Sequence, residues 1–467
     1  MKFRKILAII ISKLTIRILH IIKKGGTTLP GKVAFKLYPD ILKSIAKDFE
    51  IVMVTGTNGK TTTTRIIEEI LKNNKIDYIT NKSGANLLSG ITTTFIKAVS
   101  PFGRPRHKTA LIESDEAAFN QVTKHLQPKA VVVTNFFRDQ LDRYGELYST
   151  LNAVKSGLDR LDDKTTLILN SDDSMCASLG HETKKRVFYY GFGENACQES
   201  SESINSDAMF CIFCKGKYSY KNHVYGHLGG FYCSECGYSR PEADLECVSI
   251  EEAGSNYTSI KWKCSKALQP DEAEYTTRIN LPGLYNVYNA MAAAACGLSL
   301  NYDPKSVQKS MESFECGFGR METINVGDKT IKLILVKNPT GFNQVLNFLT
   351  LDKQQLNIAF LINDKLADGT DISWLWDVDF EHLNTVSDRI ENLFTSGIRG
   401  EDMAVRLKYG GLDTKKIRII KDYQRLIDEG LKNVPSGGCF YILPTYTAML
   451  DIRGILKKKF NLKEFWK

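Results

Sequence analysis

A glycine-rich turn stands between a short β-branched run and an amphipathic segment. It comprises Gly56, Thr57, Asn58, Gly59, Lys60, Thr61 and Thr62. Glycines let the backbone wrap a phosphate with its N–H groups pointing inward, and the start of a helix adds partial positive charge. In such a loop Lys60 would reach the β- and γ-phosphates of a nucleotide, and the Thr61 hydroxyl would bind Mg²⁺. Val54 replaces the first glycine of the general GxxxxGK[ST] pattern, so a chance turn before a helix is the alternative.

Four cysteines further along have the spacing of a zinc site. Cys211 and Cys214 form one CxxC pair, and Cys233 and Cys236 form a second pair after 18 intervening residues. Two such turns can close a tetrahedron of thiolates around Zn²⁺, which leaves no open coordination position and is typical of a structural site. The alternative is a loop with free thiols.

The segment around these cysteines also contains histidines and cations. His223 and His227 are not needed as ligands, and we interpret them as surface or packing residues. The cations are Lys215, Lys217, Lys221 and Arg240. A nucleic-acid role is disfavoured, because neither a basic stripe nor interleaved aromatic residues extend beyond this segment.

Short apolar runs that end in polar residues predict the elements that position these groups. Residues 51–54 lead into the glycine-rich turn, and residues 110–112, 130–133 and 167–169 lead into Glu113, Thr134 and Asn170. Apolar residues at helical spacing follow the turn, at Ile66 and Ile70 among others. Strands that alternate with helices indicate a mostly parallel sheet with ligands at the carboxyl ends of its strands.

The chain divides into three parts and an insertion. Residues 1–46 are basic and helical, with a Gly/Pro break at 25–31, and residues 47–322 form the nucleotide-binding domain. Residues 203–245 lack helical period and form the zinc-ribbon insertion. Residues 323–467 form a second α/β domain, whose strands we expect at 331–336, 358–362, 392–396, 417–420 and 440–443. An Ala-rich helix is expected at 286–300.

Composition narrows the function further. Of 467 residues, 43% are hydrophobic and 25% are charged, which excludes disorder as the main state, and the net charge of +9 suits anionic ligands. No run approaches the 18 apolar residues of a membrane span. The N-terminal segment lacks a small-residue cleavage site, so we interpret it as a basic amphipathic helix that docks on the body or touches a membrane. With 11 cysteines and no export signal, we expect a cytoplasmic protein.

Five separated motifs resemble those of the Mur ligase family of ATP-dependent peptidoglycan enzymes. They are the TGTNGKTT loop at 55–62, TNFFRDQLD at 134–142, NSDD at 170–173, GLYNVYNA at 283–290 and GRME at 319–322. The resemblance implies ATP and Mg²⁺ as cofactors, with Glu113 as a catalytic Mg²⁺ ligand at a strand end. It also implies that Asn286 and Asn289 contact adenine; helix packing is the alternative for Asn289. Arg320 would clamp the transferring phosphate.

One subgroup of that family, the MurT-type subunits of lipid II isoglutaminyl synthase, is similar over nearly the whole chain. Shared segments lie at 25–34, 83–86, 337–339, 367–374 and 444–447. Two departures from the wider family fit this subgroup: Gln140 replaces a His, and 335–339 reads LVKNP where amino-acid-adding ligases have DYAHNP. These losses remove groups that would place a metal or bind an incoming amino acid, whereas ammonia would need no such pocket.

The resemblance implies ATP-dependent amidation of the α-carboxylate of D-glutamate in lipid II to D-isoglutamine, through an acyl phosphate. The chain would act at the inner face of the cell membrane, in a heterodimer with a GatD-type glutaminase that supplies ammonia. Asp371 would complete the partner's Cys-His-Asp triad; its alternative role is capping a turn. Cys316 and Cys439 are interpreted as packing thiols. Whether Lys155 is modified stays open, as do the lipid II-binding residues and the ammonia route.

Two other functions remain as alternatives. A Mur or folylpolyglutamate-like ligase would add an amino acid, and a free amino acid would then stimulate its ATPase activity. A zinc-ribbon P-loop NTPase acting on nucleic acid would show salt-sensitive stimulation by RNA or DNA.

Overall fold

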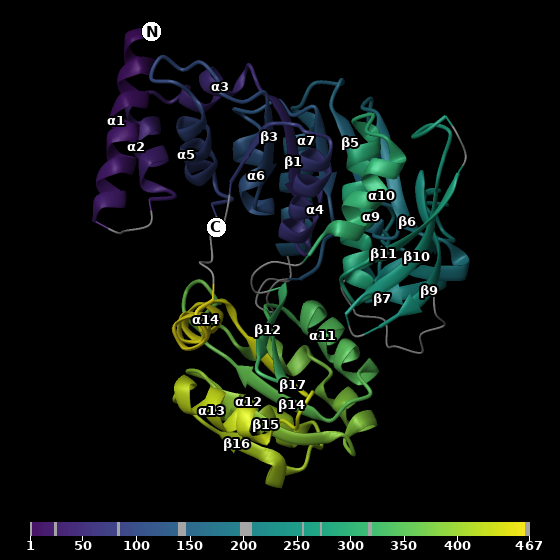
Figure 1. The fold of residues 1–467 in the computed structure, drawn as a ribbon. Helices are drawn as coiled ribbons and strands as arrows, with labels where there is room; N and C mark the ends of the chain where they lie inside the picture. Colours follow the sequence, from purple (N-terminus) through teal and green to yellow (C-terminus); the bar gives the residue numbers. More distant parts are fainter. Residues whose placement is uncertain are drawn as a thin grey trace.

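The computed structural model describes residues 2–22, 26–81, 85–138, 146–196, 208–254, 256–270, 273–315 and 320–462. Figure 1 shows two α/β bodies, one above the other, with the N-terminal helices at the outer side of the upper body. The upper body contains a nine-stranded sheet, and the lower body contains a six-stranded sheet. A mostly parallel ATP domain with a second α/β domain was predicted, and this architecture is confirmed.

The nine-stranded sheet has the order β11-β10-β9-β6-β5-β4-β1-β3-β2. Its strands are β1 (Glu50–Thr55), β2 (Tyr78–Thr80), β3 (Thr109–Glu113), β4 (Ala130–Val133), β5 (Thr166–Asn170), β6 (Val187–Phe192), β9 (Leu245–Ala253), β10 (Thr258–Cys264) and β11 (Glu274–Ile279). Neighbouring strands are parallel from β2 at one edge through to β9. The last two pairs, β9 with β10 and β10 with β11, are antiparallel. Because β1 pairs with β3 on one side and β4 on the other, its carboxyl end lies where the strand order reverses, a usual ligand position.

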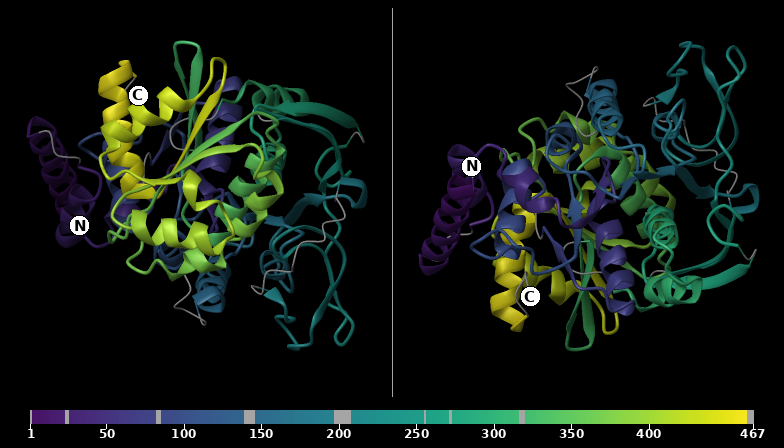
Figure 2. Two further views of the ribbon diagram at one scale, coloured as in Figure 1. Left: turned by 90° about the horizontal axis from the view of Figure 1, so that it is seen from below. Right: turned by 90° about the horizontal axis from the view of Figure 1, so that it is seen from above.

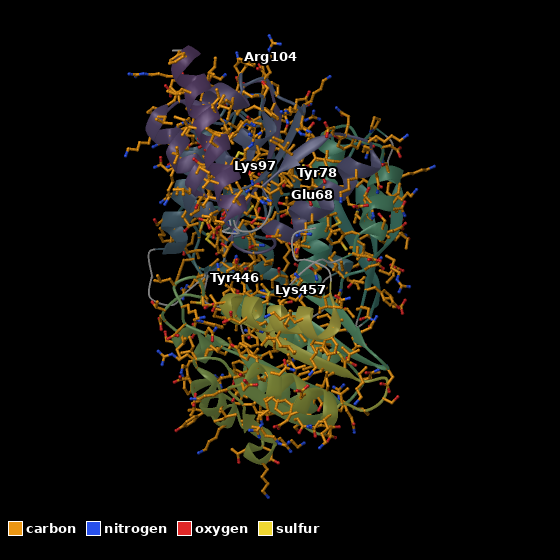
Figure 3. The ribbon with its side chains drawn as sticks, turned by 60° about the vertical axis from the view of Figure 1, so that its left-hand side comes forward. Glu68, Tyr78, Lys97, Arg104, Tyr446 and Lys457 are labelled. Atoms are coloured by element: carbon orange, nitrogen blue, oxygen red, sulfur yellow. The ribbon has the colours of Figure 1, made fainter. Side chains whose placement is uncertain are left out.

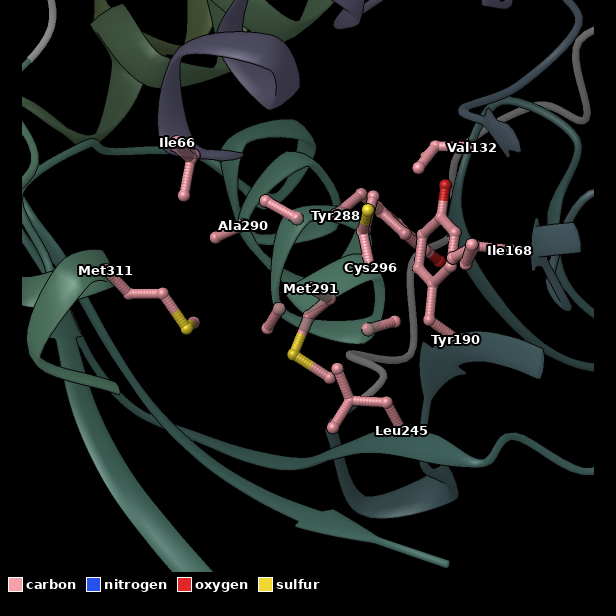
Figure 4. Close-up of a cluster of buried hydrophobic side chains, with 14 of the residues drawn as sticks. Ile66, Val132, Ile168, Tyr190, Leu245, Tyr288, Ala290, Met291, Cys296 and Met311 are labelled. Atoms are coloured by element: carbon pink, nitrogen blue, oxygen red, sulfur yellow. The ribbon is translucent and has the colours of Figure 1, made fainter. Parts of the chain in front are cut away.

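Alternate residues of β1 serve two hydrophobic cores. Val52 and Val54 join the core beneath α4 (Lys60–Asn73), α9 (Leu284–Ser299) and α10 (Pro304–Ser313). Ile51 and Met53 join the core beneath α5 (Leu88–Ala98), α6 (Glu116–Val122) and α7 (Glu146–Asp159). This alternation is the strand period of two, with both faces covered as in parallel sheets. Figure 4 shows α9 at the centre of the first core, with Tyr288 and Cys296 among its packed side chains.

Three helices precede the sheet: α1 (Lys2–Ile21), α2 (Leu29–Leu37) and α3 (Ile41–Ala46). The predicted break at 25–31 extends too far, because Pro30 and Gly31 lie in the first turn of α2. Proline is tolerated there, since the first helical N–H groups lack intrahelical partners. A side chain at Gly31 would overlap the Ser89 carbonyl of α5, so glycine permits the close approach of the two helices.

The zinc-ribbon insertion contains a two-stranded antiparallel sheet of β7 (Tyr218–Tyr225) and β8 (Leu228–Cys233). It follows α8 (Ser174–Ser178) and β6 in the chain and ends before β9. In the described segments, no helix combines the length and the apolar character that crossing a bilayer requires.

The six-stranded sheet has the order β12-β13-β17-β14-β15-β16 and is parallel except for β12. Its strands are β12 (Arg320–Val326), β13 (Lys329–Ile334), β14 (Leu356–Leu361), β15 (Ile390–Ser396), β16 (Ile417–Ile419) and β17 (Cys439–Pro444). Its main helices are α11 (Pro339–Leu351), α12 (Gly400–Tyr409), α13 (Tyr423–Asn433) and α14 (Tyr446–Phe460). Since β12 begins at Arg320, this sheet starts three residues before the expected domain start at 323. From below, Figure 2 shows this body packed against the underside of the upper body.

Candidate active site

The phosphate loop forms a preshaped cradle at the carboxyl end of β1. Gly56 and Gly59 have φ angles of 123° and 84°, a region that side chains other than glycine rarely adopt. A Cβ at Gly56 would lie 2.3 Å from Oγ1 of Thr134, and a Cβ at Gly59 would lie 1.9 Å from Oδ1 of Asn289. Both glycines are therefore required by backbone conformation and by space, and the cradle fits a phosphate group.

Two residues after β4 hold this loop in place. The backbone N–H of Thr57 donates to the Asn135 carbonyl, and that of Asn58 donates to Oδ1 of Asn135, each at 2.9 Å. The Thr134 hydroxyl donates to the Asn58 carbonyl at 2.7 Å. Thr134 and Asn135 thus contact the phosphate loop directly through hydrogen bonds.

Lys60 lies inside the loop with its ammonium group fully satisfied. Nζ donates to the carbonyls of Gly56 and Thr57, and it forms an ion pair with Oε2 of Glu116 at 2.7 Å. Burial alone would lower the pKa of Lys60, but the Glu116 carboxylate and the nearby Glu113 raise it. Lys60 is therefore charged at neutral pH, as phosphate binding requires. Glu116 was not singled out from the sequence.

The residues expected to bind Mg²⁺ lie at adjoining strand ends. Thr61 is in the first turn of α4, and Glu113 is the last residue of β3, next to β1. Asn81 fixes the end of β3 by two hydrogen bonds to the backbone of Glu113, at 2.7 and 2.9 Å. A hydroxyl and a carboxylate are the oxygen ligands that suit Mg²⁺. Thr62 is buried in the same turn of the helix.

The two asparagines expected to contact adenine lie on α9 and are both buried. Nδ2 of Asn286 donates to the Pro282 carbonyl at 2.8 Å, and Nδ2 of Asn289 donates to Oδ1 of Asn286 at 3.3 Å. The hydroxyl of Thr63 on α4 lies 3.5 Å from Oδ1 of Asn289. In this chain the amides therefore join α9 to α4 beside the loop, and an adenine contact stays a prediction.

Four thiols come together in the ribbon. All Sγ atoms lie within 4.8 Å of one another, with 3.5 Å between Cys211 and Cys236 and 3.4 Å between Cys214 and Cys233. A tetrahedron with Zn–S bonds of about 2.3 Å places sulfurs about 3.8 Å apart, so the cluster fits zinc. Burial disfavours the Cys211 thiolate, but nearby backbone N–H groups lower its pKa to about 7. Among the described residues, this metal-compatible group contains cysteine only, and His223 and His227 pack on Tyr220 and Phe137.

The ribbon is tied to the nucleotide domain through the NSDD segment. The buried Asp172 carboxylate accepts hydrogen bonds from Nε of Arg240 at 2.5 Å and from the Tyr288 hydroxyl at 2.6 Å. Gly229 of β8 donates its backbone N–H to the Asp172 carbonyl. Arg240 is thus engaged in an internal ion pair, and Asp172 joins the ribbon to α9.

At its tip, the β7–β8 hairpin reaches the loop region. A Cβ at Gly226 would lie 3.1 Å from the Phe137 ring, and the His227 ring lies 4.5 Å from that ring. The backbone N–H of Phe137 in turn donates to the Thr57 hydroxyl at 3.2 Å. The hairpin therefore supports the segment that holds the phosphate loop.

The carboxyl edge of the six-stranded sheet faces the phosphate loop. Asn338 follows β13 and caps α11 by accepting from the N–H of Gly341 at 2.8 Å. Its Nδ2 donates to Oδ1 of Asn58 at 2.9 Å. Because Asn338 is the N-cap of α11, the hydrogen bond links the second domain directly to the nucleotide site.

Asp371 lies at the same edge, in the loop after β14. Oδ1 accepts from the N–H of Ser373 and Oδ2 accepts from the Ser373 hydroxyl, each at 2.8 Å. This is the turn-capping geometry that was the alternative for Asp371, and a role in a partner's triad stays a prediction. Asp368 fixes the start of the loop by accepting from Thr447 of the 444–447 segment.

Two large apolar side chains close to Asp371 in the sequence are exposed among the described residues. Leu366 is 93% exposed and Trp376 is 55% exposed, whereas Trp374 is buried in the domain core. Arg406 secures the segment by donating to the carbonyls of Leu375 and Val378. A fixed loop with an exposed apolar rim has the character of an interface.

Several expected residues fall elsewhere. Lys155 lies on an exposed position of α7, and Cys439 is a buried packing thiol whose pKa is raised by burial. Residues 82–84, residues 139–142 with Gln140, and residues 316–319 with Cys316 lie outside the described residues, as does the Arg320 side chain. Asp172 and Asp368 were named only as members of resembling segments, and Glu116 was not named; their roles depend on contacts between distant segments.

Comparisons with known proteins agree with this geometry. A family model for the Mur ligase middle domain matches residues 54–228, and a model for the MurT ligase C-terminal region matches residues 335–449. Among solved structures, a pseudomurein peptide ligase type C from Methanothermus fervidus matches with a TM-score of 0.65 at 22% identity, covering 90% of this chain and 81% of that chain. A crystal structure of MurF from Acinetobacter baumannii matches with a TM-score of 0.65 at 16% identity, covering 91% and 80%. The fold and the loop therefore define a Mur ligase-type protein.

Two curated relatives indicate which subgroup of Mur ligase-type proteins this chain resembles. Subunit MurT of the glutamine-hydrolysing lipid II isoglutaminyl synthase of Streptococcus pneumoniae (strain ATCC BAA-255 / R6) is 36% identical over 436 residues, 93% of each chain. The corresponding subunit of Staphylococcus aureus (strain COL) is 32% identical over 455 residues, 97% of this chain and 98% of that relative. The chain belongs to the MurT family.

Proposed function

We propose that this chain is the ATP-dependent subunit of a lipid II isoglutaminyl synthase. The observation that carries the proposal is a Mur ligase phosphate loop joined, in one chain, to a MurT-type second domain that contacts it through Asn338 and Asn58. The chain is a ligase that forms C–N bonds, like its relatives. The reaction is amidation of the D-glutamate α-carboxylate of the lipid II stem peptide to D-isoglutamine.

The reaction balances with ATP and ammonia as co-substrates. The carboxylate oxygen takes the γ-phosphoryl group of ATP, and ammonia then attacks the carbonyl carbon of the acyl phosphate. Phosphate leaves with the C–O bond electrons, and the nitrogen loses a proton. Such a reaction depends on positioning and on charge neutralisation rather than on a protein nucleophile.

The residues of the chain supply those two effects. The turn at Gly59 and the start of α4 would offer backbone N–H groups to the phosphates, and Lys60 would exchange its contacts with Glu116 and the loop carbonyls for phosphate oxygens. Thr61 and Glu113 would hold Mg²⁺, which neutralises the triphosphate when bound. Arg320 would clamp the transferring phosphate.

Zinc would have a structural role in this scheme. Cys211, Cys214, Cys233 and Cys236 would hold it as thiolates, and a closed four-sulfur site has no position for a substrate. The ribbon hairpin touches Phe137 and Asp172, so the metal would stabilise the segments behind the phosphate loop.

Ammonia would come from a GatD-type glutaminase bound at the carboxyl edge of the six-stranded sheet. The fixed Asp371 loop and the exposed Leu366 and Trp376 support this position. Asp371 would orient the partner's catalytic His across the interface. Since lipid II is membrane-anchored, the complex would act at the inner face of the cell membrane.

Mass spectrometry of lipid II incubated with this chain, Mg-ATP and an ammonium salt, without a partner, tests the proposal. Replacement of OH by NH₂ lowers the mass by about 1 Da per stem peptide, and we expect this loss to require both ATP and Lys60. The proposal would be contradicted if the mass changed neither with ammonium nor with a glutaminase and glutamine. ATPase activity stimulated by a free amino acid would then indicate an amino-acid ligase, and stimulation by RNA or DNA would indicate a nucleic-acid-linked NTPase.

A further inference from the structure

The outer side of α1 carries a continuous apolar stripe that no described part of the chain covers. Phe3 is 76% exposed and Ile21 is 80% exposed, and four further large apolar side chains are exposed between them. The stripe consists of Phe3, Leu7, Ile10, Leu14, Ile18 and Ile21. Spacings of three and four residues place these side chains on one side of the helix over its whole length. This exceeds the scattered exposed apolar residues of an ordinary surface.

The opposite side of α1 packs on the protein. Ala8, Ile9 and Ser12 are fully buried, and Ala8 and Ile9 belong to the same core as α3 and α5. Lys5 donates to the Ser44 carbonyl at 3.1 Å, and Lys13 donates to the Lys97 carbonyl at 3.5 Å. The apolar stripe therefore lies on the side of α1 that does not pack on the protein, and Figures 1 and 2 show α1 at the outer edge of the molecule.

Only cations accompany this stripe in the sequence. Before Asp40 the chain has nine Lys or Arg residues and no Asp or Glu. Desolvation lowers the pKa of Lys13, and the nearby Arg106 and Arg17 lower it further, so positive groups from two segments gather beside α1.

A second segment, distant in sequence, extends the same face. The loop at 100–108 packs on α1, because a Cβ at Gly103 would lie 2.7 Å from the Lys5 side chain and 3.2 Å from Ile9. Its Phe102 is 72% exposed, and Arg104 follows two residues later. Figure 3 shows Arg104 at the top of the molecule. Two independent segments thus combine an exposed apolar side chain with cations.

We infer that α1 and the 100–108 loop form a membrane-docking face that binds anionic lipid. The apolar stripe would enter the boundary between headgroups and acyl chains, while the cations contact lipid phosphates. A second copy of this chain does not fit the face, because the charged residues of α1 are all cations and two such helices would repel each other. The inference goes beyond the proposed function, since lipid binding requires neither ATP nor an acceptor substrate.

Sedimentation of the full chain with vesicles tests this inference. We expect binding to vesicles that contain phosphatidylglycerol, weaker binding to pure phosphatidylcholine, and a decrease as salt is raised. The triple variant L7Q/L14Q/I18Q should bind at least about tenfold more weakly, because it loses buried apolar area. Its matched control, L351Q/L366Q/W376Q, removes exposed apolar side chains of the second domain and should bind as the parent does.

The outcomes distinguish a membrane-docking face from a protein interface. Equal binding of the α1 triple variant and the parent would overturn the inference, and so would equal binding of the parent to both vesicle types. A parent that is dimeric without vesicles, together with a monomeric α1 variant, would make the face a protein interface instead. The variant is folded if its thermal unfolding and its ammonium-dependent amidation of a water-soluble acceptor match those of the parent. If the parent itself fails to amidate that acceptor, the result contradicts the proposed reaction and leaves the lipid-binding inference untouched.

Discussion

The carboxyl edges of the two sheets differ in how completely this chain builds them. At the edge of the nine-stranded sheet, Lys60 has three acceptors, and Asn135 and Thr134 fix the backbone of the loop. At the edge of the six-stranded sheet, Asp371 is held by Ser373 of its own loop, and Leu366 and Trp376 face outward. The first edge is preorganised for a ligand of fixed shape, whereas the second has the rim of an interface. A synthetase site within the chain and a glutaminase site shared with a partner would differ in this way.

Loss of the loop cation should have the largest effect. In Lys60→Ala, both ammonium- and glutamine-dependent amidation should fall by about 10³-fold, because the ammonium group that lies among the loop carbonyls, where the phosphates would bind, is lost. The measurement is the initial rate of lipid II amidation with each nitrogen source. Lys72→Ala, in the exposed last turn of the same helix, is the matched control and should retain full activity. A Lys60 variant with normal rates would exclude this loop as the catalytic site.

Asp371→Asn should affect one nitrogen source only. Glutamine-dependent amidation by the assembled pair should fall by roughly 10²-fold or more, since Asn cannot stabilise a charged His, while the ammonium-dependent rate stays unchanged. The ratio of the two rates, measured on one preparation, is the readout. Equal loss of both rates with a lowered melting temperature would assign Asp371 to turn capping alone.

Loss of the hydrogen bond between Asn338 and Asn58, which joins the two sheet edges, should have an intermediate effect. Asn338→Ser keeps a helix-capping oxygen but is too short to donate to Asn58, so we expect an amidation rate about tenfold lower for both nitrogen sources. The free energy of unfolding, measured in urea, should change by less than about 1 kcal/mol. Asn338→Ala is the control, because it also removes the cap and should lose more stability. An unchanged rate in the serine variant would mean that the domains are coupled by other contacts.

Loss of the ion pair between the buried Arg406 and the half-exposed Glu381 should have the smallest effect. A hydrogen bond from Arg406 lowers the pKa of Glu381, so its stabilisation is present above the unfolded pKa and is lost as pH falls through the folded one. Because the Glu381 side chain is 53% exposed, Glu381→Gln should cost less than about 1 kcal/mol at pH 7, and this cost should vanish once the pH falls below the folded pKa. Urea unfolding at several pH values measures this difference. A loss that persists at the lowest pH would indicate a packing effect instead of an ionic one.

The sequence predicted the strands that lead into the candidate site residues. Runs at 51–54, 110–112, 130–133 and 167–169 are strands β1, β3, β4 and β5, and the five expected runs of the second domain are β13 to β17. Apart from the partly exposed edge strand β16, these strands are buried on both faces, so a short apolar run is sufficient to find them. The phosphate loop and the four-cysteine cluster were located for the same reason, since each depends on short spacing.

What the sequence did not reveal depends on contacts between distant residues. Strands β9, β10 and β11, at one end of the nine-stranded sheet, were not predicted, because charged and polar residues interrupt them and leave no continuous apolar run. Asp172 joins groups 20 to 116 residues apart, from Phe192 to Tyr288, and Asn338 reaches Asn58 across 280 residues. No local rule predicts such pairs, because they follow from the packing of complete domains.

The alanine run of α9 has a consequence for how much change the protein can tolerate. Residues Ala292, Ala293, Ala294 and Ala295 are fully buried, and a Cβ at Gly297 would lie 3.3 Å from Ile70 of α4. Larger side chains there would cost about 1–3 kcal/mol and push α4 sideways. Because Lys60 begins α4, the width of these alanines sets the position of its ammonium group. A random mutagenesis screen for cell-wall amidation should therefore find this apolar helix, which touches no substrate, nearly as intolerant as the phosphate loop itself.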